Sequence, residues 1–522
     1  MASSTPQTAL LSPIDQYMPR IYTTIFLIFE TLDRTSAVDK LRAGLTRLNQ
    51  RLPYLKGRVF ATDGGRAAIR WSPTDKDIEL QEMPTDGVPL LRLSVEKLKA
   101  ERAPLHYFTD TLGPMPRLAD LDKDSGASVL ATNYGLLDGG IVLCLAVEHN
   151  VMDGAGMVEL IRFWAACTRS ETIDPATTPT PDPNEPLYRH ERLRQATEPI
   201  TQDEHQSTPA QQSFDDLLAR HPEFRLASTK AAPAAPLPSP LGTSKIFTFS
   251  TAKLEATKTT LQTLHPGSAA RPATTTNSVL CATLWSCITR VRRQRRGREP
   301  PTTTSPTSPA AAADGVEARS RLGFAINGRA RLGAAGPLAD PRRPFLGNVA
   351  LHGLARVDVA ELERATATAA AAGDGADGAD GDATDGADGD ATASGMAALG
   401  RVVQAIGEAV GRVTPGFARE VMDLIEQTPV DGGGLAFGWN SLHGMDVMVT
   451  SWANMDLYGV DFGEGVGRPC LVRVTQRETD GFVIVLPRQR GEEEEGIDVM
   501  VAMHVEDMAA LEGDAVWTSY LV

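Results

Sequence analysis

The chain has 522 residues, 42% of them hydrophobic, and a formal net charge of −15, to which seven aspartates of one repeat between residues 374 and 390 contribute. This length exceeds what a single core usually supports, and the basic residues form no surface suited to nucleic acid. No stretch approaches the roughly 18 apolar residues of a membrane helix, which excludes a membrane-spanning class.

The first residues and the cysteines favour a cytoplasmic protein. The start, Met1–Pro6, has neither the basic nor the apolar segment of a secretory signal. No two cysteines form a Cys-x-x-Cys pair, and most stand in apolar surroundings: Cys144, Cys167, Cys281, Cys287 and Cys470. We therefore expect reduced, buried thiols, with neither disulfides nor zinc.

The N-terminal third alternates strand and helix patterns. Residues 21–29 are rich in β-branched and aromatic side chains, which predicts a buried strand. Ser36 is the expected cap of the helix that follows. The apolar face of that helix runs from Val38 to Leu48, and Pro53 ends it.

His149 lies where a second strand pattern gives way to a helix pattern. Residues 141–147 form an apolar run, and apolar side chains recur at helical spacing over 157–165. His149 is therefore predicted to leave a strand end just before a turn into a helix. An imidazole held rigidly there, with a pKa near neutrality, suits a general base. The local sequence alone leaves open a buried structural histidine instead.

The rest of the chain has a crossover and two biased insertions. Residues 170–243 are rich in Pro, Thr, Gln and Asp, which predicts a long connection with one or two helices in it. An alternating strand follows at 244–250 and a helix pattern at 278–285. Segments 300–316 and 366–395 cannot bury enough apolar surface to offset the entropy of ordering them, so we expect both to be disordered.

Several catalytic and metal-binding patterns are missing. The chain has neither a G-x-S-x-G elbow nor a Walker A loop, and its histidines never stand at metal-ligand spacing. The glycines of 463–467 follow no long apolar strand, so they do not form a dinucleotide fingerprint. His443–Asp446 is interpreted as a turn before a strand at 447–450. We expect no metal.

Two motifs together resemble a known family. His149-x-x-x-Asp153-Gly154, taken with residues 461–465 (Asp-Phe-Gly-Glu-Gly), resembles the paired signature of the BAHD acyltransferases, whose second motif usually reads Asp-Phe-Gly-Trp-Gly. Further stretches are similar to the fungal branch of trichothecene 3-O-acetyltransferase-like enzymes. These stretches follow one another in the same order as in the family, and together they span most of the chain: Leu11–Gln16, Leu52–Val59, Asn327–Arg331, Phe345–Asn348 and Thr450–Trp452.

The resemblance implies an α/β fold of two chloramphenicol-acetyltransferase-like domains. Each would have a mixed β-sheet flanked by helices, with the active site and a channel between the domains. The first domain is expected to comprise residues 1–175 and to be completed by about 446–490. The second is expected to comprise residues 244–445 and to be completed by about 491–522, with 176–243 as the crossover between them.

The resemblance also implies an activity. The expected reaction is CoA-dependent O-acyl transfer, most simply from acetyl-CoA to a hydroxyl of a fungal secondary metabolite such as a terpenoid. Neutral His149 would act as the general base in a direct transfer through a tetrahedral intermediate. We expect a monomer with acyl-CoA as co-substrate and no permanently bound cofactor.

Roles for the remaining site residues follow from position in the matching motifs. Asp153 is expected to orient the site by pairing with an arginine, first Arg329 and second Arg331. The indole N–H of Trp452 and the hydroxyl of Thr450 or Ser451 are candidate oxyanion donors, although Trp452 also suits an ordinary core position. Four further residues are expected to be structural: Gly154, Asp461, Gly463 and Gly465. Glu464 replaces the usual Trp and must face solvent or pair with a cation such as Arg468.

Three alternatives stay open at this point. A peptide-synthetase condensation domain shares the motif, but those domains resemble His-His-x-x-x-Asp-Gly, whereas Glu148 precedes His149 here. An intramolecular cyclase could use the same base without CoA. A catalytically silent binding protein would not need His149, Asp153 and Arg329 together. The sequence names neither the acceptor nor the acyl chain.

Overall fold

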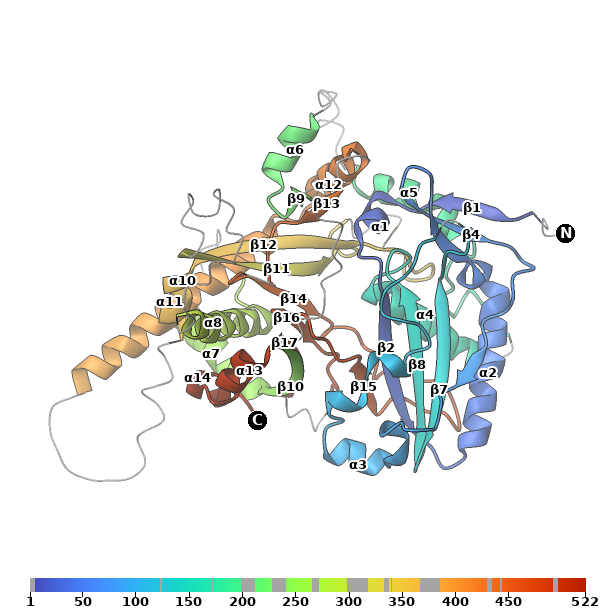
Figure 1. Ribbon diagram of the computed structural model, residues 1–522, viewed down its shortest axis with the longest axis horizontal. Coiled ribbons are helices and arrows are strands. Elements are labelled where there is room, and N and C mark those ends of the chain that lie inside the picture. Colours follow the sequence, from blue (N-terminus) through green and yellow to red (C-terminus); the bar gives the residue numbers. More distant parts are fainter. Residues whose placement is uncertain are drawn as a thin grey trace.

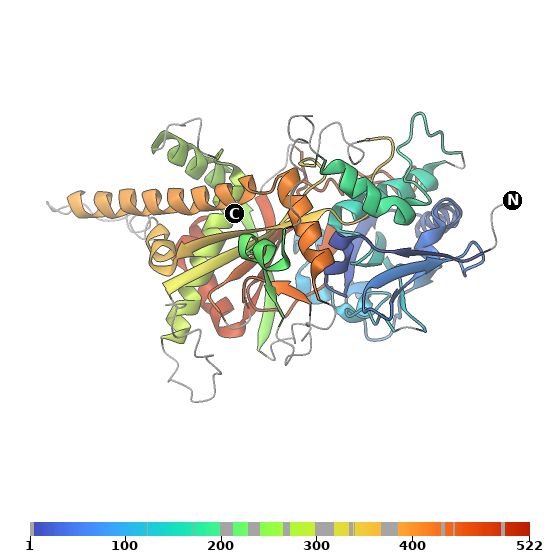
Figure 2. The same ribbon diagram turned by 90° about the horizontal axis from the view of Figure 1, so that it is seen from above.

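The structure is a computed structural model that describes residues 5–122, 124–170, 172–198, 212–227, 241–264, 272–297, 318–332, 338, 340–366, 385–429, 434–441, 444–491 and 496–522. Two mixed β-sheets with helices packed on them form two halves that lie side by side (Figures 1 and 2). The predicted α/β class with mixed sheets is confirmed. The segment 300–316, predicted to be disordered, lies outside the described residues, as do residues 367–384 of the second such segment.

A five-stranded sheet organises the first half. Its order is β15 (Leu471–Val474), β2 (Tyr22–Glu30), β8 (Gly140–Glu148), β7 (Leu130–Leu137) and β5 (Leu80–Glu82), and only the β7–β5 pair is parallel. All nine residues of β8 are buried, because helices α2 (Arg34–Arg51) and α4 (Gly154–Arg169) share the core on one face and α3 (Val95–Ala100) shares the core on the other. Strands 21–29 and 141–147 are thus confirmed within one residue at each end.

Smaller elements complete this half. An antiparallel sheet has the order β1 (Gln7–Leu10), β4 (Ala67–Trp71), β3 (Arg58–Ala61) and β6 (Ala127–Ser128). Helix α1 (Pro13–Tyr17) follows β1, and short 3-10 turns occupy η1 (Pro53–Lys56), η2 (Leu90–Arg92), η3 (Leu105–Tyr107) and η4 (Asp110–Leu112). The predicted cap of α2 was wrong: the Asp33 carboxylate accepts a hydrogen bond from the Ser36 amide (3.0 Å), so Asp33 is the cap and Ser36 lies inside the helix.

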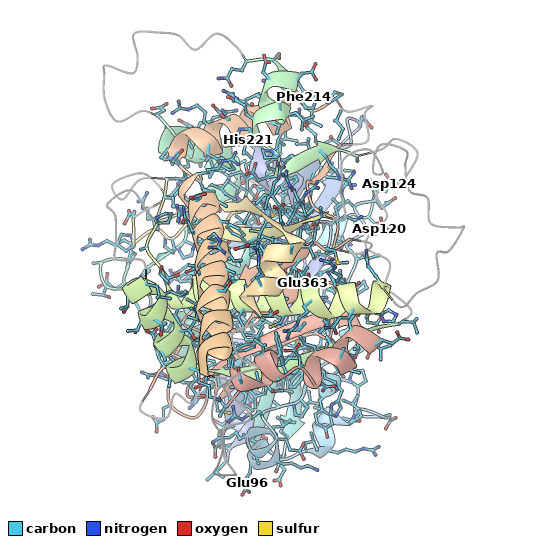
Figure 3. All side chains as sticks on the ribbon, turned by 90° about the vertical axis from the view of Figure 1, so that its left-hand side faces the viewer. Glu96, Asp120, Asp124, Phe214, His221 and Glu363 are labelled. Atoms are coloured by element: carbon cyan, nitrogen blue, oxygen red, sulfur yellow. The ribbon has the colours of Figure 1, made fainter. Side chains whose placement is uncertain are left out.

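A six-stranded sheet organises the second half. Its order is β10 (Gly242–Ser250), β17 (Gly496–His504), β16 (Phe482–Val485), β14 (Val447–Ser451), β11 (Arg319–Asn327) and β12 (Ala350–Asp358). Its outer face packs against α7 (Thr251–Leu264), α8 (Thr276–Arg296), α10 (Val359–Ala365), α11 (Asp385–Gly411), α13 (Val505–Glu512) and α14 (Ala515–Ser519). Figure 3 views this helical face, with Glu363 marking α10.

The inner face of that sheet meets the first half. Side chains alternate along a strand, so Val447 and Val449 of β14 join the helical core while Thr450 points the other way. Ile484 of β16 and Met500 of β17 pack in the core that contains β8 and α4. The range 446–490, which was expected to complete the first domain, contributes strands to both sheets. Strand β15 joins the five-stranded sheet, whereas β14 and β16 join the six-stranded one. The boundaries of the two predicted domains stay a prediction.

The crossover contains the predicted helices. It includes α5 (Glu185–Ala196), α6 (Phe214–Arg220) and the short strand β9 (Phe224–Leu226). This strand pairs with β13 (Leu435–Phe437), which follows helix α12 (Pro415–Gln427) in the chain. The disorder predicted for 366–395 does not hold for its last part, because α11 begins at Asp385. This helix continues into residues that pack in the second core.

Candidate active site

His149 follows the last residue of β8 and stays anchored to both halves. Its amide donates to the carbonyl of Ile21 beside β2 (2.9 Å), and its own carbonyl accepts from Nδ2 of Asn348 (2.9 Å). The chain then turns, with the Val151 amide bonded to the Glu148 carbonyl (3.0 Å), and α4 begins at Gly154. The predicted placement of His149 between strand and helix is confirmed.

The surroundings of His149 keep its imidazole neutral. Burial lowers its pKa below the ordinary value, and this effect exceeds the opposing influence of its own carbonyl, Asp153, the Asn348 side chain and Asp15. Burial and the nearby His149 lower the pKa of His352 on β12 to about 3. A neutral imidazole has a free lone pair, which is the form that a general base requires.

Asp153 is paired as predicted. Its Oδ2 accepts from Nη1 of Arg329 (3.0 Å) and from the Val349 amide (2.8 Å), while its Oδ1 caps α4 through the Gly156 amide (2.8 Å). Burial alone would raise the pKa of Asp153, but Arg329 and these amides lower it below its usual value. Arg331, the second choice, instead donates to carbonyls of Val410 and Val413 (3.0 and 3.3 Å).

The glycines after Asp153 are needed for space. The φ of Gly154 is not positive, so its backbone conformation is open to other residues, but a Cβ there would lie 2.9 Å from Cε of Met455. Gly156, which sequence reasoning missed, is more constrained. A Cβ at Gly156 would lie 1.9 Å from the carbonyl oxygen of Leu346, so any larger residue would push the 345–349 segment away from α4.

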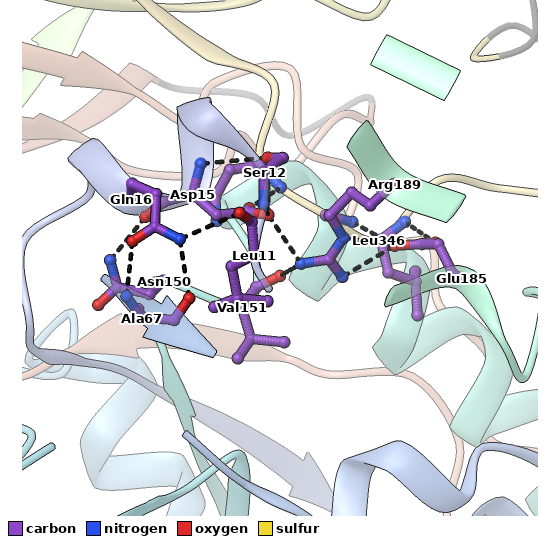
Figure 4. A network of polar contacts seen from close by, with 12 residues as sticks. Leu11, Ser12, Asp15, Gln16, Ala67, Asn150, Val151, Glu185, Arg189 and Leu346 are labelled. Atoms are coloured by element: carbon purple, nitrogen blue, oxygen red, sulfur yellow. Dashed lines mark hydrogen bonds and ion pairs between the residues drawn. The ribbon is translucent and has the colours of Figure 1, made fainter. Parts of the chain in front are cut away.

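A second buried carboxylate, Asp15 of α1, lies close to the same turn (Figure 4). Its Oδ1 accepts from the amide and Nδ2 of Asn348 (3.1 and 2.8 Å), and its Oδ2 accepts from Ser12 and from Nη1 of Arg189 (3.2 Å). Arg189 of α5 also donates to the Val151 carbonyl (2.8 Å). Sequence reasoning noted the segments of Asp15 and Asn348 as family-like but gave them no role.

Glu185 extends this network to the 345–349 segment. Its carboxylate accepts from Arg189 (2.9 Å) and from the amides of Leu346 and Gly347 (2.7 and 2.9 Å). Glu185 and Arg189 are both buried. They belong to a stretch with little sequence pattern, so no signal pointed to them.

Of the oxyanion candidates, Thr450 lies on the inner face of the six-stranded sheet, whereas Ser451 lies on the outer face, beside α8. Trp452 is buried, and its ring stands 3.4 Å from where a Cβ of Gly154 would be, which places the indole over the first turn of α4. Ser451 Oγ already donates to Oδ1 of Asn277 (3.1 Å). Among the described residues, Thr450 Oγ1 and the Trp452 N–H have no such partner, so the geometry favours Thr450 over Ser451.

Aromatic side chains gather beside His149 and form what we call the aromatic cluster: Tyr17, Phe224, His352, Phe437 and Trp439. The Tyr17 ring centroid lies 4.8 to 5.5 Å from those of Phe224, Phe437 and His352. Tyr17 and Phe437 are only half-buried. Because His149 is near enough to lower the pKa of His352, this cluster gives the site an apolar, partly accessible wall.

The second motif is remote from His149. Asp461 Oδ1 accepts from the Gly463 amide (2.8 Å), and the Asp461 carbonyl accepts from Arg169 at the C-terminal end of α4. Gly463 and Gly465 have φ of 92° and 84°, a region that favours glycine. Glu464 faces solvent, the first of the two expected alternatives. His149 precedes the other end of this 16-residue helix, which is about 24 Å long.

The described residues gather no set of three or more His, Cys, Asp or Glu side chains that could hold a metal ion. Among the helices that the structure describes, none has both the length and the apolar character needed to cross a bilayer.

Two protein-family models match this chain. One, described as the trichothecene 3-O-acetyltransferase-like N-terminal domain, matches residues 21–167, and the other, described as the transferase family, matches residues 120–373 and 388–517. The chain is 31% identical to trichothecene 8-O-acetyltransferase of Fusarium sporotrichioides, covering 99% of this chain and 98% of that one. It is 25% identical to the O-acetyltransferase ptmV of Penicillium ochrochloron, covering 98% and 96%.

The fold is similar to that of a solved enzyme structure. Fusarium graminearum TRI101, crystallised with coenzyme A and either T-2 mycotoxin or deoxynivalenol, matches with a TM-score of 0.68 and 16% identity. The match covers 98% of this chain and 99% of that one.

Removing the Asp153 carboxylate should destabilise the fold strongly. Asp153→Ala leaves the Arg329 guanidinium and two buried amides without their acceptor, so we expect a loss of about 3–5 kcal/mol. Asp33→Ala, which removes an exposed cap of α2, should lose only about 1 kcal/mol. Urea unfolding followed by tryptophan fluorescence compares the two variants. Equal losses would contradict the anchoring role of Asp153.

Proposed function

The chain belongs to the transferase family of acyl-transfer enzymes, and we propose that it carries an acetyl group from acetyl-CoA to a hydroxyl of an apolar, ring-rich fungal metabolite. The observation that carries the proposal is the buried, neutral imidazole of His149 at the end of β8, next to a turn that the Asp153–Arg329 pair fixes. Similarity to two O-acetyltransferases along almost the whole chain supports acetyl as the transferred group.

His149 would act as the general base. Its ring takes the proton from the acceptor hydroxyl as the oxygen attacks the thioester carbonyl of acetyl-CoA. The tetrahedral intermediate collapses to the acetyl ester and CoA thiolate, and the imidazolium returns the proton to that thiolate. Asp153 points away into its pair with Arg329, so it orients the turn and takes no proton.

Direct transfer is favoured over an acyl-enzyme by the state of the cysteines. Burial raises the pKa of Cys167 and Cys470 to about 11 and of Cys281 and Cys287 to about 12, and it raises that of Cys144 as well. A thiol with such a pKa is protonated at neutral pH and is a poor nucleophile. No covalent step on a cysteine is therefore included.

The aromatic cluster supports an apolar acceptor. Half-buried rings such as those of Tyr17 and Phe437 offer flat apolar surface, and His352 among them carries no charge at neutral pH. Rings of this kind bury large apolar area and favour flat or fused-ring partners over small polar alcohols. The names of the relatives agree, since one is a trichothecene acetyltransferase.

The proposal is tested by incubating the purified protein with acetyl-CoA and deoxynivalenol or glycerol. We expect acetylated deoxynivalenol and an equal amount of free CoA thiol, with no product from glycerol. His149→Ala should lower turnover about 10²- to 10⁴-fold, because the general base is lost. Wild-type turnover in His149→Ala would remove His149 from the mechanism, and equal rates with glycerol would reject the apolar acceptor.

A donor for the oxyanion is expected at Thr450. Thr450→Val removes the hydroxyl but keeps the shape, and we expect kcat to fall about 10²-fold with little change in the KM for acetyl-CoA. Ser451→Ala is the matched control, since that hydroxyl bonds to Asn277 and should contribute little. If Ser451→Ala lowered kcat more than Thr450→Val, the assignment of the donor would be wrong.

A further inference from the structure

Asn348 joins His149 to the buried Asp15 carboxylate. It lies in the 345–349 segment and is completely buried. The two hydrogens of its Nδ2 are both used, one by Oδ1 of Asp15 (2.8 Å) and one by the carbonyl of His149 (2.9 Å). An amide group has one nitrogen and one oxygen, so fixing Nδ2 on these two acceptors also fixes where the amide oxygen points.

Asp15 determines this orientation. Its two oxygens receive only donors: the amide and Nδ2 of Asn348, the amide and hydroxyl of Ser12, and Nη1 of Arg189. A flipped Asn348 would bring its amide oxygen against the carboxylate and against the His149 carbonyl, three acceptors together with no hydrogen between them. Asp15 therefore holds Asn348 in a single orientation.

Two complementary atoms remain. Oδ1 of Asn348 and Nδ1 of His149 are both buried, and in this structure neither atom makes a hydrogen bond. The two groups are neighbours, since Nδ2 of Asn348 bonds to the carbonyl of His149 and the Asn348 side chain raises the pKa of the ring. A neutral imidazole protonated at Nδ1 is a donor there, and an amide oxygen is the acceptor that such a donor needs.

We propose that Asn348 is a positioning residue for His149: its amide oxygen accepts the Nδ1 proton, so that Nε2 is left without a proton and available as the base. Asp15 acts through Asn348 by fixing the amide. The hydrogen bond made by one ring nitrogen determines which nitrogen carries the proton, and a base needs the other one free. This inference rests on the proposed function, in which His149 is the general base.

Asn150 and Glu148, the chain neighbours of His149, also have buried side-chain oxygens without a partner, but Asn348 is the side chain that acts on the ring by hydrogen bonding. The remaining groups near the ring do not supply this contact. Asp153 has both oxygens engaged by Arg329 and backbone amides. His352 is neutral and on β12. The backbone carbonyl of His149 is the one competing acceptor for the Nδ1 proton, because it lies beside its own ring. This carbonyl already accepts one hydrogen bond from Asn348.

The test reads the tautomer of His149 directly by ¹⁵N NMR of the full chain labelled at histidine. The chain has nine histidines, and the spectrum of His149→Ala identifies the signals of this residue. At pH 8, above the ordinary histidine pKa of about 6.5, we expect wild-type His149 to carry its proton on Nδ1 alone. In Asn348→Ala we expect the Nε2-protonated form to appear. We also expect the pKa of His149 to fall, because Asn348 raises it.

Asn150→Ala is the matched control. Asn150 is equally buried in the same network and donates to the carbonyls of Asp15 and Met18 (2.6 and 2.9 Å), but it does not act on the ring. We expect the same order of stability loss as in Asn348→Ala, with the tautomer and pKa of His149 unchanged. Asn348→Ser, which stays polar but is too short to reach the ring, replaces Asn348→Ala if that variant does not fold.

Three results would overturn the proposal. The proton of wild-type His149 could lie on Nε2, Asn348→Ala and Asn348→Ser could both leave the tautomer unchanged, or Asn150→Ala could change it equally. An unchanged tautomer would mean that the carbonyl of His149 suffices as acceptor. Because these readouts need no turnover, failure to acetylate deoxynivalenol would count against the proposed function and leave the role of Asn348 standing.

Discussion

Two buried carboxylates that must be paired hold this site together. A buried charge without partners is very costly, so Asp15 and Asp153 each require a full set of donors. Besides Ser12 and Gly156, which are close to them in the chain, those donors come from α5, from Arg329 after β11 and from the 345–349 segment, and they converge on the turn that carries His149. Satisfying the carboxylates therefore places the second half of the chain against the imidazole. Space is the matching constraint, because only Gly156 lets the Leu346 carbonyl approach α4.

The same arrangement explains why the site needs almost the whole chain. Asp15, His149, Arg189, Arg329 and Asn348 are far apart in sequence, and none makes these contacts within its own half alone. The neutral state of His149 depends on the burial that this assembly produces. Chemistry and stability are thus coupled: the contacts that hold the halves together also set the position and protonation of His149, the proposed base. The second motif at Asp461 contributes only at the far end of α4, which agrees with a structural role.

Sequence reasoning recovered the local features and missed those fixed by tertiary packing. The apolar run before His149 and the helical spacing after it predicted β8 and α4, because one strand buried on both faces and one amphipathic helix leave clear patterns. The Asp153–Arg329 pair came from motif order. The network of Asp15, Glu185 and Arg189 could not be predicted, since nothing in a sequence says which distant donors meet a carboxylate. Asp33 replaced Ser36 as a cap for a similar reason, because several residues near a helix start are chemically able to cap it.

The central claim is that this site receives a CoA thioester. Calorimetric titration of the wild-type protein and His149→Ala with coenzyme A tests it most directly, because binding is measured apart from chemistry and without an acceptor. The account predicts saturable binding of similar affinity in both proteins, since the imidazole acts on the acceptor hydroxyl and not on the CoA chain. Absence of binding in both would contradict the account.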